Sequence, residues 1–115
     1  MQDESAEQPS RLDIAKAEEA CGCRFPSSYL EFLALGGLSE LRFRCRILSP
    51  TEISESIASL PSKGFVPFAD NGCGDLYVWE VSGEVEPRVF FMDHDAQDAK
   101  LVAMNFVEWL LRNRF

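Results

Sequence analysis

The stretch FVPFADNGCGDLYVWEVSGEVEPRVFFM, residues 65–92, decides the fold. Three short apolar runs, at 65–69, 76–81 and 88–92, are separated by two segments that contain Asp, Asn, Gly, Ser and Pro. Such runs, bounded by turn-forming residues, are typical of strands joined by short connections. The stretch therefore predicts an antiparallel meander. Its second and third strands are apolar on both faces, so we expect them to be central and covered.

Another strand is predicted upstream of the meander. Apolar and basic side chains alternate in residues 41–47, and this period of two indicates a strand with one solvated face. The inward set is Leu41, Phe43, Cys45 and Ile47, and the outward set is Arg42, Arg44 and Arg46. A row of arginines suits nucleic acid, but charged side chains also protect an edge strand from pairing with other molecules. Because the net charge is −8, we favour edge protection or a protein contact.

Two helices are predicted before this strand. The first runs from about Ser10 to Ala20, opens with a capping pattern, and ends at Gly22. The apolar residues of this helix, Leu12 among them, recur at an approximately helical spacing. The second helix opens at Pro26, and a Gly-Gly pair that begins at residue 36 ends it.

Two further helices are predicted after the strand. Residues 49–52, Ser-Pro-Thr-Glu, supply a cap, a proline in the first turn and a glutamate at the third position, so a short helix should run to just before Pro61. Polar residues 93–100 are interpreted as a loop. A terminal amphipathic helix follows. Its apolar positions are Phe106, Val107, Leu110 and Leu111.

These elements predict one α+β domain with a mainly antiparallel sheet of about four or more strands, helices packed against it, and a C-terminal helix. The chain of 115 residues fits a single domain, which we place at residues 10–115. Residues 1–9 are polar, carry three acids and should form a disordered tail. Large apolar side chains should form the core, among them Phe32, Trp79, Phe91, Phe106 and Leu110.

Composition and charge indicate the cellular compartment and the class of binding partner. Nineteen acidic residues against eleven basic ones disfavour nucleic acid and anionic membranes, and they favour a basic protein partner. The acidic N-terminus does not resemble a secretory signal, and no apolar stretch is long and uninterrupted enough to span a bilayer. We therefore expect a cytoplasmic protein whose four cysteines are reduced thiols.

The sequence contains no convincing motif for a catalytic or metal-binding site. His94 lies between two aspartates, but the sequence contains no Gly-x-Ser-x-Gly motif that would supply a nucleophile for it to activate. Cys21 and Cys23 are separated by one residue, which is too close for a structural zinc motif. The acidic segment 70–75 lacks the distal glutamate of an EF-hand. The sequence thus predicts no catalytic residue, no metal and no cofactor.

Several segments together resemble the SUKH superfamily, in particular its Smi/Knr-like (cell-wall assembly regulator-like) domains. Residues 21–33, CGCRFPSSYLEFL, resemble the turn and second helix of that domain. Residues 48–53 resemble the entry to its middle helix, and 65–75 its strand with a Gly-Asp signature. Residues 88–95 resemble the strand that ends in an acidic pair, and 105–110 the closing helix.

The resemblance implies an α+β domain without catalytic machinery. Many bacterial members look like immunity proteins that bind and block a toxin, often a nuclease or deaminase, and the partner that this implies here is a basic toxin domain. The competing interpretation is a regulatory protein-interaction module, as in the fungal branch. A small enzyme that uses His94 with Asp75 or Asp95 is the weakest alternative.

Acidic residues gather at the predicted strand ends. In a meander, the turn after the first strand and the loop after the third share one end of the sheet, so their acids should form a joint patch that steers a cationic partner. Tyr77 or Trp79 could be exposed beside it. The alternative is that these are solvated turn residues. The candidate partner-binding residues are Asp70, Asp75, Asp93, Asp95 and Asp98.

Overall fold

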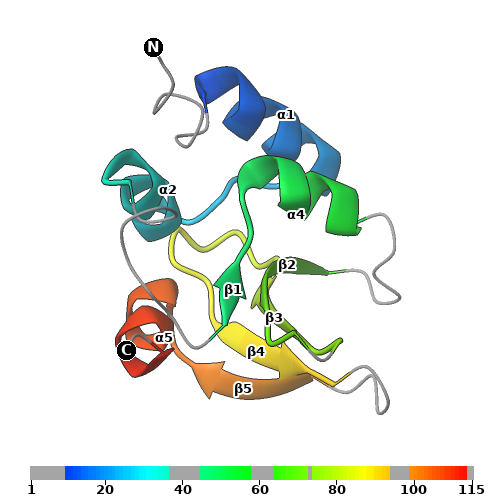
Figure 1. Cartoon of the computed structure of the whole chain (residues 1–115), viewed down its shortest axis with the longest axis vertical. Helices are drawn as coiled ribbons and strands as arrows, with labels where there is room; N and C mark the ends of the chain where they lie inside the picture. The colour runs from blue at the N-terminus through cyan, green and yellow to red at the C-terminus, as the bar shows by residue number, and fades with distance from the viewer. Residues whose placement is uncertain (1–9, 37–44, 58–63, 73, 94–98, 114–115) are drawn as a thin grey trace.

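The predicted meander forms the middle of an antiparallel sheet. The computed structural model describes residues 10–36, 45–57, 64–72, 74–93 and 99–113 (Figure 1). Its helices are α1 (Arg11–Cys21), α2 (Ser27–Ala34), α4 (Pro50–Ile57) and α5 (Phe106–Asn113). Its strands are β1 (Arg46–Ile47), β2 (Phe65–Asp70), β3 (Leu76–Glu80), β4 (Val89–Met92) and β5 (Ala99–Ala103). Within the described residues, these strands pair in chain order, β1-β2-β3-β4-β5. The α+β architecture is confirmed.

The predicted helix caps of α1 and α4 are confirmed. At the start of α1, the Ser10 hydroxyl accepts from the Asp13 amide at 3.1 Å and the Asp13 carboxylate accepts from the Ser10 amide at 3.3 Å. Gly22 ends α1 in the left-handed conformation, with φ 72°. At α4, the same reciprocal pattern joins Ser49 and Glu52. The predicted end of this helix near Pro61 lies outside the described residues.

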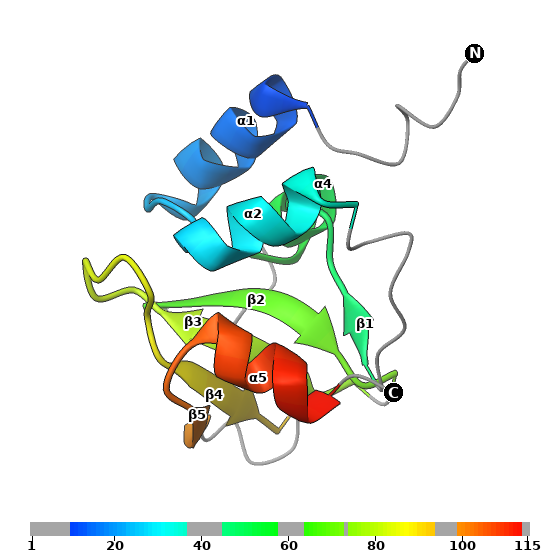
Figure 2. The same cartoon turned by 90° about the vertical axis from the view of Figure 1, so that its left-hand side faces the viewer.

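One face of the sheet carries the main core. Residues from α1, α2, α4 and α5 pack there with strand residues Val66, Phe68, Trp79 and Val89 in a single buried cluster. Helix α5 lies against the sheet beside α2, while α1 packs on α4 and lies farther out (Figure 2). Phe68 stacks on Trp79 with ring centroids 4.7 Å apart, and α5 adds Phe106 and Trp109 edge-on to Phe68. The sheet is therefore held by an aromatic core.

Strands β3 and β4 are central in the sheet, as predicted. The described helices pack in the cluster on one face. On the other face Val78 and Met92 are buried, and the half-buried rings of Phe65 and Phe90 lie with their centroids 5.6 Å apart.

Strand β5 was not predicted. Residues 93–100 were expected to be a loop, yet Ala99 and Lys100 already pair with β4, at Met92 and Phe91. The sequence of Ala99–Ala103 does not alternate strictly between apolar and polar side chains, and the register with β4 shifts between Val89 and Phe90. Pairing with β4 at the sheet edge, rather than local pattern, makes this segment a strand.

The predicted core is right in part. Phe32, Trp79 and Phe106 are buried, but Phe91 and Leu110 are only half-buried. The apolar positions of the terminal helix also include errors, since Val107 and Leu111 are exposed and the buried partner of Phe106 is Trp109. Leu12 of α1 is exposed as well, at 62%. The upstream strand is described only at its end, where Arg46 is exposed at the sheet edge, as predicted, and Cys45 and Ile47 are partly buried; residues 41–44 lie outside the described part.

We predict that Phe106→Ala lowers the free energy of unfolding by about 3–5 kcal/mol, because it removes a ring from the centre of the aromatic core. Leu111→Ala on the same helix is the matched control; its side chain is 61% exposed, so the cost should stay within about 0.5 kcal/mol. Urea denaturation of both variants measures the difference. Equal costs would contradict the burial assigned to α5.

Candidate functional site

The sheet register brings acidic turn residues to one end. Asp70 pairs with Leu76, and Leu76 pairs with Met92, so the end of β2, the start of β3 and the end of β4 lie side by side. Asp70, Asp75 and Asp93 therefore share this end of the sheet, which we call the acidic end. The other two candidates, Asp95 and Asp98, lie outside the described residues.

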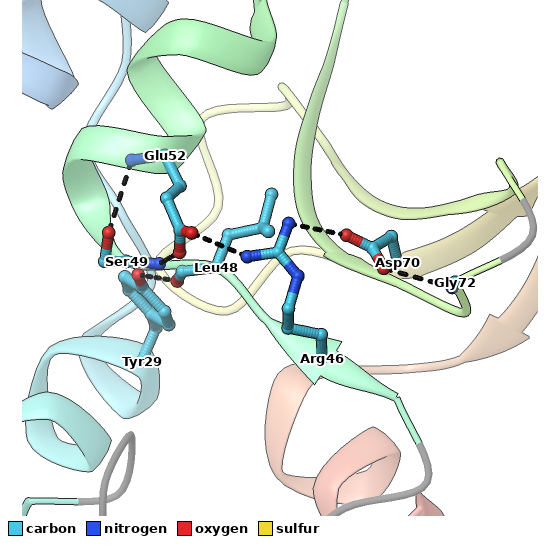
Figure 3. Close-up of polar contacts among 7 residues, drawn as sticks. All are labelled: Tyr29, Arg46, Leu48, Ser49, Glu52, Asp70 and Gly72. Carbon is cyan, nitrogen blue, oxygen red and sulfur yellow. Dashed lines mark hydrogen bonds and ion pairs between the residues drawn. The ribbon is translucent and has the colours of Figure 1, made fainter.

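Asp70 is already engaged within the fold. Its Oδ2 accepts from the Arg46 guanidinium at 2.9 Å, and its Oδ1 accepts from the Gly72 amide at 3.1 Å (Figure 3). The side chain is 21% exposed, so the ion pair is partly shielded from solvent. The guanidinium and the turn amide thus reduce the negative potential that Asp70 can offer to a partner.

Asp75 and Asn71 shape the turn between β2 and β3. The Asn71 side-chain amide donates to Asp75 Oδ2 at 3.0 Å, and the Asp75 backbone amide donates to Asn71 Oδ1 at 3.3 Å. Gly72 and Gly74 have φ values of 81° and 96°, the left-handed region that other residues rarely adopt. The two glycines therefore allow the tight connection between β2 and β3.

Arg46 bridges the acidic end to the start of α4. Its Nη1 donates to Glu52 Oε2 at 2.6 Å while Nη2 holds Asp70 (Figure 3). The hydrogen bond from Arg46 to Glu52 is the main cause of a raised pKa at Arg46. Burial alone would raise the pKa of Glu52, but hydrogen bonds from Ser49 and Arg46 outweigh it and lower that pKa. The bridge therefore favours the ionised form of the Glu52 carboxylate.

Next to the bridge is a buried hydrogen bond of the core. The Tyr29 hydroxyl donates to the Leu48 carbonyl at 2.7 Å, one residue before the α4 cap (Figure 3). Burial is the largest cause of a strongly raised pKa at Tyr29, so the hydroxyl keeps its proton and remains a donor. β1, α2 and α4 are joined at this point.

The sequence did not reveal the role of Arg46. The alternation in residues 41–47 placed its side chain on the solvated face, and we favoured edge protection or a protein contact for the arginines. Ser49 and Glu52 carried a visible capping signal, but Asp70 is 24 residues from Arg46. Only strand pairing between Arg46 and Asp70 brings these two side chains together.

The expected exposure of an aromatic residue at the acidic end is wrong for Trp79. Trp79 is 2% exposed, and its ring is stacked on Phe68 in the core. Tyr77 is half-buried and its ring lies 5.2 Å from that of Trp109. Side chains alternate along β3, so Tyr77 and Trp79 both face the helices that cover this side of the sheet.

The described cysteines are free thiols. Burial is the main cause that raises the pKa of Cys21 to about 11, and burial also raises the pKa of Cys23. Thiols with raised pKa values are poor nucleophiles and poor metal ligands at neutral pH. In the part of the chain that the structure describes, no group of three His, Cys, Asp or Glu side chains could hold a metal ion. His94 and Cys73 lie outside that part.

A groove lies at the other end of β3. It has a volume of about 370 Å³ and is lined on one side by the turn between α1 and α2 and on the other by the β3–β4 connection. Val66 and Trp79 line its interior, and Arg24 and Glu84 are charged residues in its lining. No short sequence pattern predicts this groove, because the segments that line it are far apart in the chain.

A family comparison agrees with the arrangement of helices and strands. The sequence profile of the SMI1 / KNR4 family (SUKH-1) matches residues 8–112. The chain belongs to this family. The resemblance stated from the sequence motifs is thereby confirmed, and the family supports a protein-interaction or immunity domain in general terms.

A search of curated proteins found no match. Among the helices of the described residues, none has the length and apolar character needed to cross a membrane.

We predict that Glu52→Gln lowers the free energy of unfolding at pH 7 by about 0.5–1 kcal/mol, the size of a partly exposed ion pair. Glutamine can still accept from the Ser49 amide, so the variant removes mainly the charge. Because the pKa of Glu52 is lowered in the folded state, its contribution is present above the ordinary Glu pKa of about 4.3 and is lost as pH falls through the folded value.

Urea denaturation between pH 7 and pH 3 measures this difference. The two proteins should differ at pH 7 and converge at pH 3. Glu55→Gln, an exposed position on the same helix, is the control and should match the wild type throughout. A difference that persists unchanged at pH 3 would contradict the assigned pKa direction.

Proposed function

We propose that this protein is a non-catalytic immunity protein that acts in the cytoplasm and neutralises a cognate, nuclease-type toxin by binding it. The observation that carries the proposal is the match to the SMI1 / KNR4 family (SUKH-1) over residues 8–112. The net charge of −8 adds physical support, because complementary charge accelerates association with a cationic nuclease domain.

The proposed steering surface is the acidic end. Asp75 and Asp93 share this end of the sheet, and Asp95 and Asp98 follow Asp93 closely in the sequence. Asp70 should contribute least, because Arg46 already neutralises its charge. Charges at the rim of an interface mainly change the association rate and its dependence on salt.

Co-expression with the product of the neighbouring toxin-like reading frame tests the proposal. The wild-type protein should restore growth of cells that express that toxin, and the two purified proteins should form a complex. A toxin that is neither bound nor blocked would overturn the immunity proposal. An isolated gene with no such neighbour would favour the regulatory interaction module instead.

We predict that the double variant Asp93→Lys with Asp95→Lys slows association with this toxin by about tenfold or more at low salt, since reversing two charges removes electrostatic steering. Its association rate should also depend less on salt. The charge-matched control is Glu31→Lys with Glu55→Lys, two exposed helix positions away from the acidic end.

Stopped-flow association at several salt concentrations gives the comparison, and circular dichroism confirms that both double variants are folded. The association rate of the control should fall only by the amount that the change in net charge causes. Equal association rates in the two variants would place the interface elsewhere.

A further inference from the structure

We propose that the groove between residues 22–26 and the β3–β4 connection anchors the protein partner by taking one apolar side chain that is flanked by a Lys or Arg. This inference rests on the proposed protein-binding function and adds a second, separate contact to it. Strand β3 begins beside Asp75 at the acidic end and ends at Glu80, which lines the groove. The two surfaces therefore lie at opposite ends of this strand.

The shape and lining of the groove suit an apolar side chain. Pro26 and Pro87 line it together with Val66, Trp79 and the exposed side chain of Val81. Its volume of about 370 Å³ lies in the range of sites that bind small ligands or single anchoring side chains. Interfaces gain most of their affinity from a few side chains that fill such pockets.

Long-range hydrogen bonds hold the two walls of the groove in place. On one wall, the Phe25 amide donates to Glu18 Oε2 at 2.7 Å, which fastens the turn to α1. On the other, Glu86 accepts from the Ser28 amide at 2.9 Å and from the Ser28 hydroxyl. Pro26 offers no side-chain cap to α2, so Glu86 caps this helix from the β3–β4 connection.

The groove is therefore preorganised. Walls that are fixed before binding lose little conformational entropy when a partner binds. The Val81 amide, which donates to the Gly64 carbonyl at 2.8 Å, extends the β2–β3 pairing to the edge of the groove.

The groove lining includes three charged side chains, those of Glu80, Glu84 and Arg24. Glu80 is paired with Arg88 at 2.9 Å, whereas the Glu84 carboxylate has no ion pair within the described residues. With a net charge of −8 on the chain, Glu84 is left to pair with a Lys or Arg of the partner.

The experiment uses a peptide probe that carries the proposed chemistry. N-acetyl-leucyl-argininamide is titrated into the full-length ¹⁵N-labelled protein and followed by NMR. The indole resonance of Trp79 and the backbone amides of residues 22–26 and 81–84 should shift, with a dissociation constant in the millimolar range. Trp109, which does not line the groove, is the internal control and should not shift.

Variants test the charge preference. Glu84→Lys should weaken binding of the probe by about threefold to fivefold, the effect of one exposed ion pair, while Glu55→Lys on α4 should leave it unchanged. The anionic probe N-acetyl-leucyl-glutamate amide should bind more weakly than the cationic one. No shifts at the groove, shifts centred on Trp109 or the acidic end, or equal affinity in both variants would overturn the inference.

The same spectra distinguish other occupants. Groove amides that shift with protein concentration would indicate a second copy of the chain, and groove amides that shift on deletion of residues 1–9 would indicate the N-terminal segment. Either result would overturn the proposal. Toxin binding without a probe response would overturn this inference alone, whereas a probe response without toxin binding would overturn only the immunity proposal.

Discussion

The hydrogen bond from the Tyr29 hydroxyl to the Leu48 carbonyl is the contact on which the rest of the structure depends. Tyr29 is fully buried, and its ring packs edge-on against Phe25, Trp79 and Phe106, which come from the α1–α2 turn, β3 and α5. The hydroxyl satisfies a backbone carbonyl at the entry to α4. One side chain thus joins the sheet to three helices, and removal of either partner would leave a buried polar group unpaired.

Acidic side chains serve two different purposes in this protein. Glu18, Glu52 and Glu86 accept hydrogen bonds from backbone amides that would otherwise lack acceptors at turns and helix starts. Asp70 holds Arg46 and the following turn. These contacts pair part of the negative charge with groups of the protein itself. The net charge alone therefore overstates the surface potential that a partner meets. The proposed binding role is assigned to the acids of the acidic end and to Glu84.

The two proposed binding features lie at opposite ends of one strand, β3. Steering by the acidic end would act on the encounter with a partner, and an apolar anchor in the groove would act on the lifetime of the complex. The bridge through Arg46 connects the acidic end to α4, while Glu86 connects the groove to α2. Both features are therefore built on elements that the aromatic core fixes in place.

The sequence by itself determined the local features of this protein. The caps of α1 and α4, the stop at Gly22, the meander and the positive φ of Gly72 and Gly74 all depend on residues a few positions apart, so short patterns reveal them. The resemblance to the family was also visible in ordered motifs. The tertiary structure decided the rest. Strand β5, the half-burial of Phe91, the Arg46 bridge and the groove each require segments that are distant in sequence, and their contacts form only when strand pairing and helix packing bring those segments together.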